Sequence, residues 1–267
     1  GSVFWMWSIA IIGSASAFVE STLAQIYKRK GKGGCYGGPA YYIETALKNR
    51  PLAVIFSVLL VVTYGVGFNM LASYNLQSTF SSYSFYNNET SPWIIGFVLA
   101  AVVLYCLMGG GKRVVKVTGF LVPFMGIAYI LVALFIVVIN ISELGGIFAR
   151  IFADAFDFDA IFGGFSGSCV MYGIKRGLFS NEAGMGSTPH AHAMAQTSPH
   201  VQGTVAMTGV FFDTAVVLTM MALIIISTIY TGDGPLANVA GRNYHEVLLN
   251  AGLTQTNLVQ YAVASVS

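Results

Sequence analysis

The sequence predicts an all-α protein, a polytopic bundle of transmembrane helices, and three observations lead to that fold class. Hydrophobic residues make up 55% of the 267 residues and charged residues only 9%, whereas about a quarter of a soluble domain is charged. The mean hydropathy of +0.71 points the same way. The apolar residues form continuous runs near the roughly 20 residues that a bilayer requires, whereas β-barrel strands would alternate apolar and polar positions.

Six apolar runs are expected to form helices of a single, incomplete transmembrane domain covering residues 1–267. Their approximate bounds are residues 3–27, 52–77, 93–108, 117–141, 161–177 and 205–230. A seventh run begins near Leu258. The first helix begins at residue 3 with no signal peptide ahead of it, so we expect the chain to be a fragment.

The basic residues predict the orientation of the chain. Most of the 13 Lys and Arg lie in alternate loops, at residues 28–50, 112–116 and 175–176. Because Lys and Arg of short loops are retained on the cytoplasmic side, the first helix is expected to start outside and cross inward. This topology, with anionic headgroups, accounts for the positive charge, and the sequence has no basic stripe that would indicate nucleic acid.

The fifth run predicts a broken helix. It contains GGFSGS at residues 163–168, which is poor material for a continuous helix. Short, glycine-interrupted membrane segments typically mark broken helices, whose freed backbone groups bind substrates or ions at mid-membrane. Close helix packing through small residues is the alternative. We expect the helix to be interrupted between Gly163 and Ser168.

Carboxylates inside apolar runs are costly, so they indicate function by default. Asp213 lies well inside the last long run and is followed by Thr214. It is either a functional group or a structural tie to Lys175, Arg176 or a helix N-terminus.

Two further polar positions have a structural alternative. Glu20 lies near the cytoplasmic end of its run, where pairing with Lys28 or Arg29 is the favoured reading. Tyr64, Phe68 and Asn69 share roughly one helix face, which suits either a small polar ligand or helix packing.

The sequence offers no catalytic or metal site and no cofactor motif. His190 and His192 are two residues apart and do not form the i, i+4 pair of a helical metal site. Ser180 and Ser187 lie near Glu182, but no nucleophile elbow surrounds them. The three cysteines are too scattered for a disulfide framework or metal cluster.

Four motifs, in matching order, resemble the alanine or glycine:cation symporter family. They are FWMW at residues 4–7, FVESTLAQIY at 18–27, GGPAYYIE at 37–44 and GIKRGLFSNEAGMGS at 173–187, the last followed by Pro189 and Gln202-Gly203. The resemblance implies a LeuT-like architecture of five-plus-five inverted repeats. Residues 3–27 would then be the second helix and residues 161–177 the broken sixth, and the first and eighth helices would lie outside this chain.

The implied function is sodium-coupled symport of a small neutral amino acid, alanine or glycine, by alternating access in the inner membrane of a prokaryote. Its partners would be the amino acid, the sodium ion and the lipid bilayer, with sodium as the coupling ion and no other cofactor. One alternative is an ion channel, which would also use broken helices and embedded carboxylates, and another is a transporter-like amino-acid sensor that binds substrate without moving it. We expect the chain alone not to transport alanine, since half of the implied central site is outside it.

The resemblance also implies roles for particular residues. Backbone groups near the predicted break would hold the charged ends of the substrate, and three side chains would shape its pocket. The substrate-binding set is Phe68, Asn69, Gly164, Ser166, Gly167, Ser168 and Met171. The gate or structural network is Arg176, Asn181 and Glu182, and the cation or coupling pair is Asp213 and Thr214. Many family members carry Gln where this chain has Ala72, so the preference among small amino acids does not follow.

Overall fold

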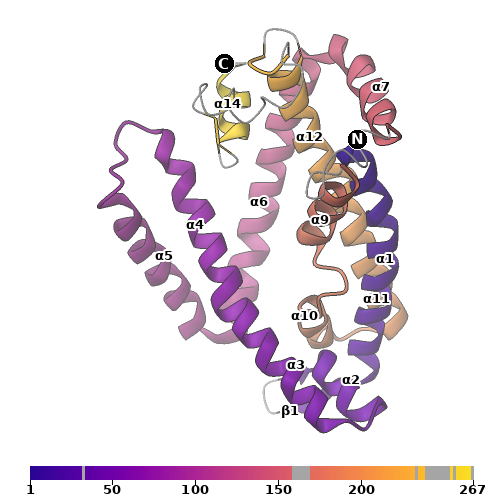
Figure 1. Ribbon diagram of the computed structural model, residues 1–267. Coiled ribbons are helices and arrows are strands. Elements are labelled where there is room, and N and C mark those ends of the chain that lie inside the picture. The colour runs from indigo at the N-terminus through magenta and orange to yellow at the C-terminus, as the bar shows by residue number, and fades with distance from the viewer. Residues whose placement is uncertain (32–33, 158–168, 232–233, 238–252, 255–256, 266–267) are drawn as a thin grey trace. The chain divides into compact units, whose positions relative to one another are not determined.

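The computed structural model describes residues 1–31, 34–157, 169–231, 234–237, 253–254 and 257–265 (Figure 1). The chain divides into two compact units. Unit 1 comprises Gly1–Gly65 and Gly145–Thr219, and unit 2 comprises Val66–Leu144 and Met220–Ser267. The predicted break at residues 163–168 lies outside the described residues and stays a prediction.

Within the described residues, five helices are long and apolar enough to cross a membrane, by length and composition. Three are α1 (Ser2–Ile26), α5 (Ser91–Met108) and α6 (Gly110–Ile139). The fourth, Arg50–Thr79, joins α3 (Arg50–Val62), a π-helical segment (Thr63–Phe68) and α4 (Asn69–Thr79). The fifth, Pro199–Tyr230, joins α11 (Pro199–Phe212), a π segment (Asp213–Leu218), α12 (Thr219–Ile225) and a second π segment (Ile226–Tyr230). The predicted all-α polytopic bundle is confirmed.

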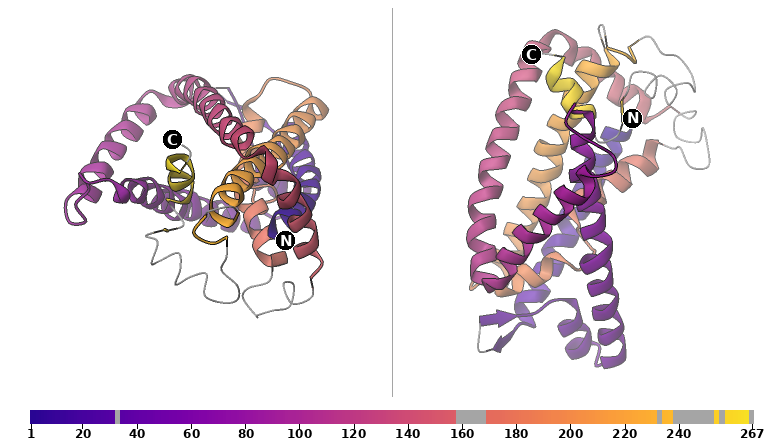
Figure 2. Two further views of the ribbon diagram at one scale, coloured as in Figure 1. Left: turned by 90° about the horizontal axis from the view of Figure 1, so that it is seen from above. Right: turned by 90° about the vertical axis from the view of Figure 1, so that its left-hand side faces the viewer.

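Shorter elements connect these helices. They are α2 (Pro39–Ala46), α7 (Leu144–Ala155), α9 (Cys169–Asn181), α10 (Thr188–Met194), α14 (Leu258–Ala264) and the 3₁₀ turns Phe80–Ser82 and Ile141–Glu143. A small antiparallel ribbon of β1 (Arg29–Gly31) and β2 (Gly34–Tyr36) was not expected; the right-hand view of Figure 2 shows it as short arrows. Gly34 has a φ of +128°, a conformation that glycine adopts without strain.

Two long helices begin at side-chain caps. Asn49 accepts a hydrogen bond from the backbone N–H of Leu52 at 3.0 Å, and Ser198 accepts one from Val201 at 3.4 Å. Each cap is followed by a proline in the first turn, where the missing N–H has no helical partner to lose. These local signals explain why α3 and α11 begin a few residues before the apolar runs that predicted them.

One part of the core of unit 1 is the parallel packing of α1 against α9. Gly173, Gly177 and Asn181 recur every four residues and are the buried residues of α9. A Cβ on Gly173 would overlap the backbone of Ser2, and one on Gly177 would overlap the side chain of Ile9. This spacing of small residues lets two backbones approach closely, as small-xxx-small motifs do in membranes.

α1 also packs against α11 and α7. Ala17 of α1 and Ala206 of α11 share a buried cluster with Ala183. At the N-terminal end of α1, the ring of Phe4 meets Phe152 of α7 at a centroid distance of 5.7 Å, and Trp7 meets Phe148 at 6.3 Å. α1 therefore has neighbours in α7, α9 and α11, and Figure 1 shows it running beside α9 and α11.

Unit 2 exposes most of its apolar surface. No residue of α5 is buried, and α6 buries only Ala133 and Ile136, which meet Ile224 and Ala262. Exposed apolar helices of this length suit contact with lipid. The sequence placed residues 112–116 in a loop, whereas they lie in the first turns of α6. Long basic side chains near a helix end can reach the headgroups, so charge alone does not end a helix.

Candidate functional site

The central feature of unit 1 is a helix interruption, the segment of residues 182–187 between α9 and α10, which we call the signature turn. At its start, Asn181 and Ala183 lie opposite Gly13, the midpoint of α1. Past its end, the carbonyl groups of His192 and Ala195 accept hydrogen bonds from Gln25. Non-helical backbone therefore runs beside the C-terminal half of a long apolar helix. Such backbone at membrane depth must be satisfied by protein or water, and it typically forms binding sites.

Local sequence explains why the helix stops at this place. Glu182, Gly184 and Gly186 have φ values of +50°, +86° and +82°, which break helical geometry and suit glycine at two of the three positions. The side-chain oxygen of Asn181 accepts the backbone N–H of Ala183 at 3.0 Å. Pro189 then lies in the first turn of α10. The glycines of the GMGS part of the motif are thus required by the positive φ angles of the turn.

Two carboxylates hold the signature turn. Glu20 of α1 accepts the backbone N–H of Gly184 at 3.0 Å. Glu182 accepts the hydroxyl of Tyr64 at 3.2 Å and that of Ser187 at 2.5 Å. The Glu20 carboxylate thereby replaces one helical partner that the turn lacks, and Glu182 ties the turn to Tyr64 and Ser187.

The expected pairing of Glu20 with Lys28 or Arg29 is wrong. Arg29 pairs instead with Glu44 of α2 at 2.8 Å, and Lys28 donates to Gln25 and to the carbonyl of Ala195. The Glu20 carboxylate binds the backbone of the signature turn instead, and its partner there lies 164 residues further along the chain. No local pattern in α1 could have revealed this partner.

Residues from α2 and α10 complete the surroundings of the turn. Burial raises the pKa of Tyr42 to about 12, and the nearby charge of Glu20 adds to the effect. The Tyr42 hydroxyl therefore stays neutral beside that carboxylate. Nδ1 of His190 faces the carbonyl oxygens of Gly186 at 3.1 Å and Ser187 at 3.3 Å, so Nδ1 carries the proton.

A second polar cluster joins α9 to the start of the π segment at Asp213. The hydroxyl of Ser180 donates to the carboxylate of Asp213 at 2.7 Å, and Arg176 adds a favourable charge interaction. Asn181 donates to the hydroxyl of Thr214, which is fully buried, at 3.5 Å. Residues that the sequence assigned to separate gate and coupling roles therefore form one network.

The predicted substrate-binding set stays a prediction, because its members lie in two separately described units and partly outside the described residues. Met171 lies half-buried in α9 of unit 1. Phe68 ends the π segment and Asn69 begins α4, both in unit 2. Gly164, Ser166, Gly167 and Ser168 lie outside the described residues.

The structure corrects the place of one basic pair. Lys175 and Arg176 were counted with a cytoplasmic loop, but both lie in α9, between two glycines that touch the first third of α1. The loop prediction assumed that a basic pair marks a helix end. Here the helix continues to Asn181, and the positive charge of Arg176 interacts favourably with the carboxylate of Asp213.

The geometry of the two serines does not favour hydrolytic chemistry. Ser180 and Ser187 each donate to a carboxylate and not to a histidine. In the part of the chain that the structure describes, no group of three His, Cys, Asp or Glu side chains could hold a metal ion. Sequence reasoning missed Ser180 as the partner of Asp213 and Tyr64 as the partner of Glu182, because both pairings link distant segments.

Comparison with known proteins gives a consistent result. A model described as the sodium:alanine symporter family matches residues 1–266. The amino-acid carrier protein AlsT of Bacillus subtilis (strain 168) is 43% identical over 248 residues, which cover 92% of this chain and 52% of that protein. The probable sodium/glutamine symporter GlnT of the same organism is 46% identical over 227 residues, covering 85% and 47%. The sodium/alanine symporter AgcS of Methanococcus maripaludis is 40% identical over 232 residues, covering 84% and 50%. The chain spans about half the length of these curated relatives.

Proposed function

Because the chain belongs to the sodium:alanine symporter family, we propose that the protein containing it couples the entry of sodium to the uptake of a small neutral amino acid, alanine or glycine, across the cell membrane of a prokaryote. It is a transporter and not an enzyme. The observation that carries the proposal is the signature turn, where non-helical backbone and two carboxylates lie beside the C-terminal half of an apolar helix.

In this proposal Arg176 and Asn181 connect the end of α9 to Asp213 and Thr214, which would carry the response to the cation. Glu182 holds the signature turn to Tyr64, and Glu20 holds it to α1. Asp213 starts a π segment, and π segments are frequent at functional sites. Binding of the cation and binding of the substrate would stabilise the same arrangement, which is what couples them.

The amino-acid pocket remains a prediction from the family resemblance. Phe68, Asn69, Met171 and backbone groups at residues 164–168 would line it, within a LeuT-like arrangement of inverted repeats. Relatives named for alanine and for glutamine are similarly close to this chain, so the side-chain preference needs its own measurement.

The test is uptake of labelled alanine, glycine and glutamine by the full-length protein in proteoliposomes. Uptake should require an inward sodium gradient and should stop when potassium replaces sodium. Asp213→Asn should lower sodium-driven uptake by tenfold or more while the protein remains folded, whereas Asp154→Asn, an exposed carboxylate of α7, should leave uptake unchanged.

Other outcomes identify the alternatives. Downhill flux that saturates weakly and ignores the sodium gradient would indicate a channel. Tight alanine binding with no flux under any gradient would indicate an amino-acid sensor. A dependence on the proton gradient alone would replace sodium as the coupling ion.

A further inference from the structure

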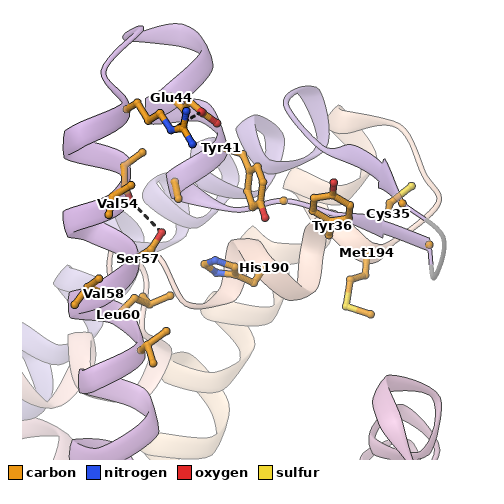
Figure 3. Close-up of a pocket in the computed structure, with 17 residues that line it drawn as sticks. Cys35, Tyr36, Tyr41, Glu44, Val54, Ser57, Val58, Leu60, His190 and Met194 are labelled. Atoms are coloured by element: carbon orange, nitrogen blue, oxygen red, sulfur yellow. Dashed lines mark hydrogen bonds and ion pairs between the residues drawn. The ribbon is translucent and has the colours of Figure 1, made fainter.

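A groove of about 870 Å³ lies at the end of unit 1 that carries the β ribbon. Arg50, Val54, Ser57, Val58 and Val61 of α3 form one wall, and their spacing of three to four residues makes them a single helical stripe. Figure 3 shows Tyr36, Tyr41 and His190 across from this helix.

The groove is apolar along α3. Val54, Val58 and Val61 are exposed by 53%, 56% and 68%, and they belong to a helix long and apolar enough to span a membrane. Phe56 and Tyr64 of the same span face the signature turn, so the valine stripe lies on a different face of that helix, although His190 contacts both the groove and the turn. A hydrocarbon chain is the natural neighbour for such a stripe.

The end of the groove near Arg50 is positively charged, because Arg29 and Arg50 lie there with a single carboxylate among the described residues, that of Glu44. Glu44 is its acidic residue, and that carboxylate is already bonded to Arg29 at 2.8 Å. Arg50 is 83% exposed and approaches Glu44 only at 3.9 Å, which leaves most of its guanidinium donors for another anion. Arg29 lies 5.2 Å from the ring centroid of Tyr41, and Tyr36 packs edge-on against that ring at 5.4 Å. Tyrosines of this kind are enriched at the headgroup level of membranes.

From this juxtaposition we propose that the groove binds one anionic phospholipid. The phosphate contacts Arg50 and the outer face of Arg29, the headgroup rests against Tyr41, and one acyl chain lies along Val54, Val58 and Val61. Arginine donors fit phosphate oxygens in forked geometry, which favours Arg50 over a lysine at this position. This site is independent of the proposed transport activity.

The experiment is native mass spectrometry of the full-length protein in mild detergent, titrated with phosphatidylglycerol or phosphatidylcholine. We expect one phosphatidylglycerol to be retained in preference to phosphatidylcholine. Arg50→Gln should weaken retention about fivefold, the order expected for one basic residue near an anionic membrane surface. Lys48→Asn removes an equal charge from the same exposed loop outside the groove and should leave retention unchanged.

A second pair of variants tests the acyl-chain part. Val58→Trp should fill the groove and lower retention, whereas Val62→Trp, at a position equally exposed by 56% on the same helix but outside the groove, should not. Glycerol phosphate without acyl chains should not displace the lipid.

Equal losses with Arg50→Gln and Lys48→Asn would overturn the proposal, because they would show adsorption to the loop charge and not a site. Retention unaffected by Val58→Trp would also overturn it. So would a cross-link from a cysteine at position 58 to another segment of the same chain, since protein would then fill the groove.

Discussion

At the scale of single residues, glycines decide how closely α9 approaches α1. A Cβ on Gly173 would meet backbone atoms of Ser2 and Met6, which cannot move without shifting α1. A Cβ on Gly177 would overlap Cγ2 of Ile9, but its next neighbour, the carbonyl oxygen of Met6, would be 3.4 Å away, so a side-chain atom and not backbone has to move. The two positions look equivalent in the sequence and differ in what they touch.

We therefore expect Gly173→Ala to destabilise the full-length protein by about 1–3 kcal/mol, the usual range for overpacking, and Gly177→Ala to cost less. Gly126→Ala in α6, where nothing lies within 4 Å of the added methyl group, should be neutral or slightly stabilising. Melting temperatures in detergent measure all three. Equal losses at positions 173 and 177 would contradict the difference between the backbone neighbours of Gly173 and the side-chain neighbour of Gly177.

His192 gives a prediction about pH. Burial lowers the pKa of His192 below its ordinary 6.5, and its neutral Nδ1 lies against the side-chain amide of Gln202. A histidine held neutral in the folded state contributes stability above pH 6.5, and that stability is lost as the pH falls toward the lowered pKa, because the unfolded chain binds the proton first.

Melting temperatures measured between pH 8 and pH 5 should therefore fall on the acid side, and His192→Asn, which keeps an acceptor but cannot titrate, should reduce the fall. His200→Asn, at an exposed position, is the control and should keep the wild-type slope. An unchanged slope in His192→Asn would show that another group is responsible.

At the scale of elements, hydropathy predicted the long helices but not their internal irregularities. The apolar runs and the proline and Asn or Ser caps specify where α3, α5 and α11 lie. The π segments at Thr63–Phe68 and Asp213–Leu218 begin with polar residues that the sequence does show, but those residues do not specify a π-helical hydrogen-bond pattern. The sequence showed that the signature turn is polar. It did not show that the helix is interrupted there, because the interruption depends on positive φ angles that a glycine can adopt but need not adopt.

The turn itself supplies the next prediction. Gly184→Ala and Gly186→Ala should each cost about 1–2 kcal/mol, because alanine is strained at positive φ. Gly186→Ala should cost more, since its methyl group would also lie 2.7 Å from the ring of Phe56 and 3.0 Å from Pro39. Both should reduce sodium-driven uptake. Gly209→Ala, in regular helix with nothing within 4 Å, should retain stability and uptake.

At the scale of the whole molecule, the sequence predicted a membrane bundle and its family, whereas the partners of the buried polar groups came only from the structure. Glu20 with Gly184 and Ser180 with Asp213 join segments that local patterns treat separately. The sidedness that the basic residues predict stays a prediction; in unit 1, Lys30 of β1 and Gln196 after α10 line one cavity, while Asp154 lies beside Gly1 at the N-terminal end of α1.

Sidedness can be measured directly. In a background with the native cysteines replaced, Lys30→Cys and Gln196→Cys should react with a membrane-impermeant thiol reagent only from the cytoplasmic side, and Asp154→Cys only from outside. The physical reason is that α1 spans the bilayer between the two groups. Labelling of positions 30 and 154 from the same side would refute this orientation.

The close contact between Gly13 and Asn181 has an evolutionary consequence. A Cβ at position 13 would lie 3.2 Å from the Asn181 amide nitrogen, so the smallest residue on one helix permits a branched amide on the other. The two positions should therefore be epistatic. Gly13→Ala and Asn181→Ser should each lower the melting temperature, and the double variant should lose less than the sum of the two, because the shorter side chain makes room for the methyl group. Across diverging relatives, a larger residue at one position should be tolerated only after a smaller one has arisen at the other.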